Sequence, residues 1–189
     1  FNLTPEQRTF LATVPPGVFR ETTKELLMNQ QFRRDLWVKG SPRLKITEQL
    51  QLLRAHRFVM SAAREHMPKE MNCNLGTAAL QENLYKPLYD LFDQYKQAPL
   101  SLGQIIDALQ SQGQSQAAIV QSVAVLVTLG GLSLVQSEEA TKAALPVTQR
   151  LNHYLIERAA HRPEVAQLAS PVTGTAVGVQ QLLQLFLLA

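Results

Sequence analysis

The pattern of hydrophobic and polar positions over residues 97–136 predicts two consecutive short helices. Ser101 followed by Gln104 fits a capping box, in which the two side chains bond each other's backbone, and it predicts a helix over residues 102–110. A polar break then leads into a run of Ala, Ile, Val and Leu that predicts an apolar helix over residues 116–129. The two helices, joined by a short break, are typical of a helix-turn-helix.

The residues that follow the apolar helix complete a winged-helix outline. Gly130 and Gly131 can end the helix in a left-handed cap, and residues 132–136 then alternate like a strand. A DNA-binding winged helix places the side chains that read bases on its second helix. The predicted second helix contains no Lys, Arg or Asn, so it lacks the groups that neutralise phosphates or contact a guanine edge.

Helical spacing and helix-start signals predict further helices on both sides of this pair. Thr4 followed by Pro5 is typical of a helix N-terminus, and the apolar positions over residues 84–95 fall at helical spacing. We expect helices from residue 5 to just before residue 15, over residues 18–29 with Phe19, Leu26 and Leu27 on the apolar side, over residues 84–95 and 146–160, and from residue 179 onward. Residues 47–53 are expected to form a short helix or a connector. Residues 32–39 fit a helix end or a strand, with Trp37 and Val38 favouring the strand, and a further short strand is expected near residues 57–61.

These elements predict a mainly α fold with small β elements. Residues 66–74 are expected to form an irregular loop, which is the best internal boundary. The expected organisation is a helical N-terminal module over residues 1–80, followed by a winged-helix-like helical module over residues 81–189.

Composition restricts the protein class without naming a function. Of the 189 residues, 46% are hydrophobic and only 17% are charged, against about 25% in soluble proteins, and the net charge is a modest +3. Cys73 is the only cysteine, so we expect a reducing, cytoplasmic location. No uninterrupted apolar stretch reaches the roughly 20 residues of a membrane span. The start at Phe1 and the uncharged end after Glu164 lead us to expect a piece of a longer protein.

Three stretches of the chain together resemble one protein family. They are residues 3–11 (LTPEQRTFL), residues 29–39 (NQQFRRDLWVK), and residues 168–174 (LASPVTG) continuing to residues 181–186 (QLLQLF). The set is similar to the predicted methyltransferase regulatory domain that follows the catalytic domain in bacterial S-adenosylmethionine-dependent methyltransferases, relatives of which include protein-lysine methyltransferases. The resemblance implies that residues 1–80 form the regulatory-type module and that the remainder forms the following winged-helix-like segment.

The resemblance implies a non-catalytic role for this chain. A methyltransferase of this class needs a glycine-rich turn between a strand and a helix to bind its cofactor. The nearest segment, residues 174–178, is not followed by the acidic ribose ligand. The resemblance therefore implies that the catalytic domain and S-adenosylmethionine belong to another part of the parent protein. The expected partners are that catalytic domain and a protein substrate.

A basic segment over residues 33–69 is the sharpest local charge signal. It contains nine Lys or Arg residues against three acidic residues. One interpretation is an electropositive face for an acidic partner, and the other is an ordinary solvated surface with local ion pairs. Under the first interpretation the candidate partner-binding residues are Arg33, Arg34, Lys39, Arg43, Arg54 and Arg57.

The chain shows no convincing pattern for metal binding or nucleophilic catalysis. His56, His66 and Cys73 match no common zinc spacing, and His153 and His161 lack a third ligand. Ser170 precedes a proline without the Gly-x-Ser-x-Gly elbow, and Cys73 has no identifiable histidine partner. We therefore assign no catalytic, cofactor-binding or metal-binding residue.

Three functional hypotheses remain open at this level. The first is a regulatory or substrate-recognition region of a bacterial methyltransferase, which would show no methyl transfer by itself. The second is a winged-helix DNA-binding regulator, which would bind duplex DNA in a salt-dependent way. The third is a protein-interaction scaffold with no link to methyl transfer. The sequence leaves the methyl acceptor, the sign of the regulation and the oligomeric state undetermined.

Overall fold

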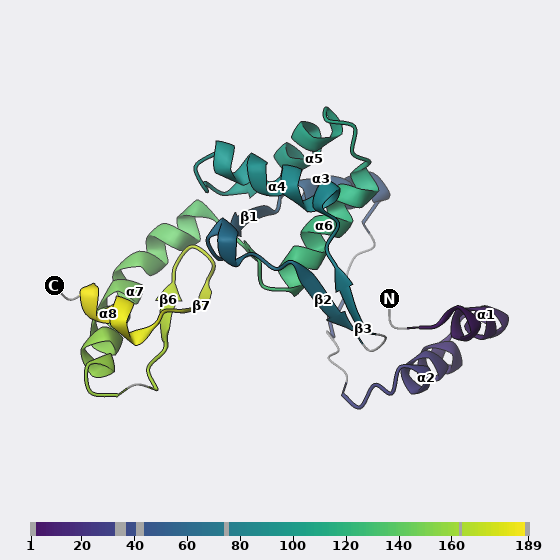
Figure 1. The fold of residues 1–189 in the computed structure, drawn as a ribbon, viewed down its shortest axis with the longest axis horizontal. Coiled ribbons are helices and arrows are strands. Elements are labelled where there is room, and N and C mark those ends of the chain that lie inside the picture. The colour runs from purple at the N-terminus through teal and green to yellow at the C-terminus, as the bar shows by residue number, and fades with distance from the viewer. Residues whose placement is uncertain (1–2, 33–36, 41–43, 74–75, 163, 188–189) are drawn as a thin grey trace.

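The computed structural model describes residues 3–32, 37–40, 44–73, 76–162 and 164–187. Helices dominate, and the strands form three small antiparallel sheets, so the predicted fold class is confirmed. The elements are α1 (Pro5–Thr13), α2 (Val18–Leu27), α3 (Ile46–Ala55), β1 (Arg57–Met60), the 3-10 turn η1 (Arg64–His66), β2 (Glu70–Cys73), β3 (Gly76–Ala79), α4 (Glu82–Gln94), β4 (Leu100–Ser101), α5 (Leu102–Gln110), α6 (Gln116–Thr128), β5 (Leu132–Leu134), α7 (Glu138–Ala159), β6 (Gln167–Ser170), β7 (Thr175–Gly178) and α8 (Gln181–Phe186) (Figure 1).

The main hydrophobic core belongs to a central module that we define as α3 to β5, residues 46–134. Its three-stranded sheet has the order β4-β1-β5, and Phe58 of β1 lies opposite Leu100 of β4 and Leu134 of β5. The sheet packs with α4, α5 and α6 around side chains that are almost fully buried. The largest of these are Leu88, Phe92, Leu100, Leu102, Ile105, Ile106, Leu109, Ile119, Leu126 and Leu132.

The two helices predicted within residues 97–136 are confirmed as α5 and α6. The Ser101 hydroxyl accepts a hydrogen bond from the Gln104 N–H at 3.1 Å, and the Gln104 side chain accepts one from the Ser101 N–H at 2.8 Å. Gly130 ends α6 with a φ of +74°, a left-handed conformation that favours glycine. Local capping chemistry therefore sets both ends of this pair.

The winged-helix description beyond this pair stays a prediction. The middle position of the sheet is taken by β1, which precedes the helices in the chain, and β5 leads directly into α7. The module boundary near residue 80 also stays a prediction. The pairing of β1 with β4 and β5 nevertheless joins residues on both sides of that boundary.

The sequence predictions for residues 66–74 and for the start of the helix before residue 160 were wrong. The loop expected over residues 66–74 contains β2, which pairs with β3 as an antiparallel hairpin. The helix expected to begin at Pro146 begins at Glu138, because the Ser137 hydroxyl caps it by accepting from the Ala140 N–H at 3.1 Å. Pro146 is inside this 22-residue helix and not at its start.

The C-terminal unit combines α7, the β6–β7 hairpin and α8. The Asn152 side chain on α7 bonds both backbone groups of Ala169 on β6. Gln184 of α8 is fully buried and donates to the carbonyl oxygens of Val165 and Val179, both at 2.8 Å. In Figure 1, α7, β6 and β7 follow one another across the unit, with β7 farthest from α7.

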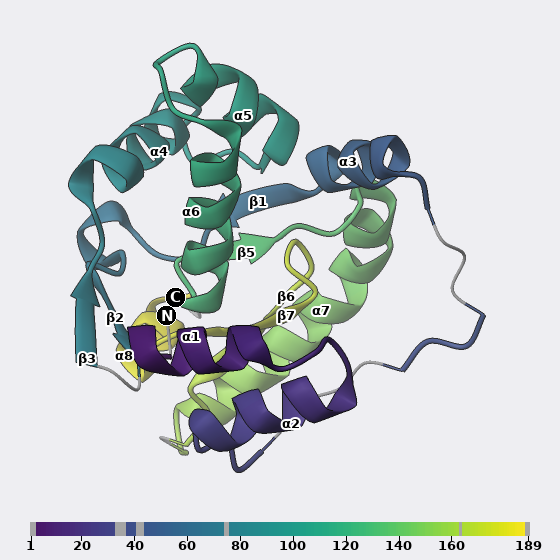
Figure 2. The ribbon, with the colours of Figure 1, turned by 90° about the vertical axis from the view of Figure 1, so that its right-hand side faces the viewer.

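The N-terminal pair of helices, α1 and α2, lies to one side of the central module (Figure 1). A long connection, whose described residues 28–32, 37–40 and 44–45 are neither helix nor strand, leads from α2 to α3 (Figure 2). The strand predicted at Trp37 and Val38 is therefore wrong, because nothing described pairs with these residues. Among the described helices, none has the length and apolar character needed to cross a membrane.

Candidate protein-docking surface

The α1–α2 pair is held together by few buried groups. Thr4 and Gln7 form a capping box that begins α1, and the Gln7 amide donates to the Leu27 carbonyl oxygen of α2 at 3.4 Å. Leu11 and Val14 are the buried hydrophobic residues of this segment. Helix α2 itself contains no buried residue.

Helix α2 instead presents an apolar face to solvent. Phe19 and Leu26 are seven residues apart and therefore on one face of the helix, and they are 75% and 76% exposed. Trp37 is 89% exposed in the connection that follows. We call the exposed large hydrophobic residues of this segment the N-terminal apolar surface: Phe10, Val18, Phe19, Leu26, Phe32, Trp37 and Val38.

Sequence reasoning placed Phe19 and Leu26 on the apolar side of α2 but missed that nothing described covers them. The periodicity of α2 put Phe19 and Leu26 on one side of the helix, which normally predicts a buried side. The available signal was the lack of large apolar residues in α1 to pack against them, since α1 contributes only Phe10 and Leu11. An exposed apolar concentration of this kind is typical of a protein-interaction site.

Several cations of the basic segment pair with acids of other elements. The Arg54 guanidinium at the end of α3 donates to both carboxylate oxygens of Asp107 on α5, at 2.8 and 2.9 Å. Arg57 on β1 lies 3.5 Å from Glu138 at the start of α7. These contacts match the local ion-pair interpretation and join neighbouring elements at the surface.

Arg64 makes the most extensive of these contacts. It binds Asp90 at 2.5 Å and also Asp93, both on α4. Hydrogen bonds to Asp93 and then to Asp90 raise the pKa of Arg64 above its ordinary value. This arginine therefore joins η1 to α4.

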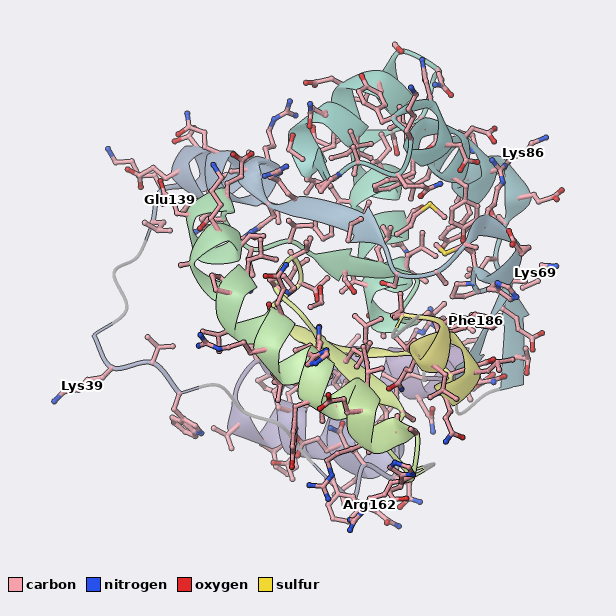
Figure 3. All side chains as sticks on the ribbon, turned by 90° about the vertical axis from the view of Figure 1, so that its left-hand side faces the viewer. Lys39, Lys69, Lys86, Glu139, Arg162 and Phe186 are labelled. Atoms are coloured by element: carbon pink, nitrogen blue, oxygen red, sulfur yellow. The ribbon has the colours of Figure 1, made fainter. Side chains whose placement is uncertain are left out.

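The remaining candidate residues divide into one exposed lysine and three outside the described residues. Lys39 lies in a turn and extends away from the molecule (Figure 3). Arg33, Arg34 and Arg43 lie outside the residues that the structure describes. A partner-binding role for the six candidate residues stays a prediction.

The solvent-facing side of α6 is neutral. Ile119, Ser122, Val123 and Leu126 face the core, so the helix is buried on one side and not all around. The exposed positions are Gln116, Ala117, Gln121, Ala124 and Thr128. This stripe has no cation for a phosphate.

The described residues offer no evident metal or nucleotide site. No group of three or more His, Cys, Asp or Glu side chains within them is arranged to hold a metal ion. His153 pairs with Glu157 at 3.3 Å, and the Ser170 hydroxyl accepts from the Thr173 N–H at 3.2 Å in the β6–β7 turn. All pairings among the described strands are antiparallel, so these residues do not build the parallel βαβ unit that binds a nucleotide-like cofactor.

Comparison with known proteins links the N-terminal segment to methyl transfer. Residues 1–39 match the family model of the predicted methyltransferase regulatory domain, which supports that family for this part of the chain. The chain is 30% identical over 188 residues to the uncharacterized protein sll1526 of Synechocystis sp.. The alignment covers 100% of this chain and 37% of that relative, so the chain spans little more than a third of its length. No solved structure matches.

Proposed function

We propose that this chain is a non-catalytic regulatory region of a bacterial S-adenosylmethionine-dependent methyltransferase. In this proposal the N-terminal apolar surface docks on the catalytic domain. The central module, with its extensive core, then serves as the rigid body to which the docking helices are attached. The docked helices would shape or cover the methyl-transfer site and so control its access.

One coincidence carries the proposal. The segment that matches the regulatory family, residues 1–39, contains α1, α2 and every residue of the N-terminal apolar surface. This segment matches a family model but is poorly packed within its own chain. We therefore expect its apolar side chains to be buried against another domain or protein. The chain also spans only 37% of its relative, which leaves ample room for a catalytic domain in a parent of similar length.

The chemistry of the surface fits a protein partner. Burying a large apolar side chain contributes about 1.5–3 kcal/mol, and aromatic residues such as Trp37 and Phe19 are typical anchors of interfaces. The neighbouring positions on α2 include Arg20, Glu21, Lys24 and Glu25, which are of mixed charge. An apolar centre with a mixed polar rim is the usual anatomy of such an interface.

The finer parts of the proposal concern the parent protein. We propose that S-adenosylmethionine binds the catalytic domain, that the methyl acceptor is a protein, and that the enzyme works in the bacterial cytoplasm. The resemblance to protein-lysine methyltransferases motivates the choice of acceptor. The single cysteine motivates the compartment.

Reading the gene on either side of this segment is the first test. The proposal expects a strand, a glycine-rich turn and a helix, in that order, in the same reading frame. A polypeptide without such a unit would overturn the link to methyl transfer.

Reconstitution is the second test. The purified catalytic domain is titrated with this chain, while binding is followed by calorimetry and methyl transfer by labelled S-adenosylmethionine. Phe19→Ser combined with Leu26→Ser should weaken binding by more than about tenfold, because two anchors are lost. The matched control is Leu183→Ser with Phe186→Ser, which removes one Leu and one Phe at exposed positions of α8 (55% and 70%). Equal weakening by both double variants, or methyl transfer by this chain alone, would contradict the proposal.

A further inference from the structure

The two edges of the β6–β7 hairpin differ in whether their backbone groups have hydrogen-bond partners among the described residues. On β6, the Asn152 amide donates to the Ala169 carbonyl oxygen at 2.9 Å, and its oxygen accepts from the Ala169 N–H at 2.7 Å. A side chain thus takes the place of a neighbouring strand and closes this edge. Figure 1 places β7 on the opposite side of the hairpin from α7.

The register of the hairpin shows which backbone groups point outward from β7. Ala169 lies opposite Ala176, and both polar groups of Ala169 point away from β7 toward Asn152. Residues that face each other in an antiparallel pair alternate between bonded and non-bonded pairs. The N–H and C=O groups of Ala176 therefore point outward, and by the same alternation those of Gly178 do as well.

The outer edge of β7 lacks the usual protection against strand pairing. All four of its residues are exposed, and Val177 is 39% exposed. Natural edge strands are commonly protected by lysine, proline or a bulge, and Thr175–Gly178 has none of these. An edge of this kind pairs with an extended backbone segment.

We propose that β7 pairs antiparallel with β7 of a second copy of this chain. A two-fold axis at Val177 places Ala176 of each copy opposite Gly178 of the other, so that two such pairs form. The outward groups of both residues are then satisfied by four backbone hydrogen bonds. The two Val177 side chains face each other as a non-bonded cross-strand pair, which is the closest spacing in an antiparallel sheet.

Self-complementarity is the reason to choose a second copy as the partner. A two-fold contact brings identical charges together, so it requires a surface free of charge at the axis. From Val165 to the end of the chain no residue is charged, although the whole chain has a net charge of +3. The small side chain of Ala176 and the absence of one at Gly178 allow close approach of the two backbones. The contact is small, so the expected dimer is weak and depends on concentration.

Sedimentation equilibrium of the full chain tests the proposal over a wide concentration range. The wild type should show a monomer–dimer equilibrium. Val177→Lys should weaken the dimer by about tenfold or more, because two ammonium groups then face each other across the axis. Val172→Lys is the matched control: Val172 lies in the turn between β6 and β7, is 36% exposed, and receives the same change of size and charge away from the edge.

A charge-complementation experiment separates edge pairing from a loss of folding. Val177→Lys and Val177→Glu should each be monomeric when studied alone, and an equimolar mixture should recover a dimer containing one chain of each. A monomeric wild type at all concentrations would overturn the proposal. Equal loss in both lysine variants, a dimer that Val177→Lys leaves intact, or a mixture that stays monomeric would overturn it as well.

Discussion

The central module and the N-terminal helix pair are built from similar local signals but differ in what they bury. Helices α1 and α5 each begin with a capping box, and α2, like α5, is clearly amphipathic. In the central module the apolar face of α5 is buried in a core shared by three helices and a sheet. In the N-terminal pair only Leu11 and Val14 are buried. Good helix signals therefore do not by themselves give a self-sufficient unit, because packing supplies most helical stability.

Removing one phenylalanine side chain from each region should produce the largest contrast. Phe92 is fully buried and Phe19 is 75% exposed. Phe92→Ala should lower the free energy of unfolding by about 3–5 kcal/mol through lost burial and a cavity. Phe19→Ala should change it by about 0.5 kcal/mol or less. Urea unfolding followed by far-ultraviolet circular dichroism measures both, because the fluorescence of the exposed Trp37 is a poor probe of the core.

This contrast would fail in a recognisable way. A loss of more than about 2 kcal/mol in Phe19→Ala would mean that α2 is packed in solution. The N-terminal apolar surface would then be covered by this chain itself, and the proposed docking on a catalytic domain would lose its basis.

Breaking the two capping boxes should give a smaller contrast. Ser101→Ala removes the acceptor for the Gln104 N–H and should destabilise the protein by about 1 kcal/mol, the usual cost of losing a cap. Thr4→Ala removes the acceptor for the Gln7 N–H and should reduce helicity in α1 without moving the urea midpoint. Hydrogen exchange resolved by residue reports the local effect. Equal shifts of the urea midpoint would show that both regions unfold as one unit.

Elements with local start and stop chemistry could be predicted from the sequence. The α5–α6 pair was predicted nearly to the residue, because Ser101, the polar break and Gly130 act within one helical turn of the ends they set. Helix α7 was predicted too short because Pro146 is a common helix start, whereas the N-cap was Ser137. The β2–β3 hairpin was missed because its strands carry no alternating β-branched pattern and β3 is exposed throughout.

The candidate docking surface was less predictable, because it consists of apolar side chains that no described element covers. The periodicity of α2 identified Phe19 and Leu26 as one face, but only the tertiary arrangement shows whether another element covers that face. The ion pairs of the arginines could not be predicted for the same reason. The ion pairs of Arg54 with Asp107 and of Arg57 with Glu138 join residues that are 53 and 81 positions apart in the chain.

The smallest expected effect is on DNA binding. We expect neither the N-terminal helix pair nor the central module to bind duplex DNA tightly. The exposed stripe of α6 is neutral, and Arg54, Arg57 and Arg64 already have carboxylate partners. Fluorescence anisotropy with a labelled duplex should therefore detect no binding tighter than about 1 µM at physiological salt. Gln121→Glu on the outer face of α6 should leave the titration unchanged. A DNA-binding α6 would instead show an affinity that falls steeply with salt and is weakened by this added carboxylate, which would favour the winged-helix regulator over the docking surface.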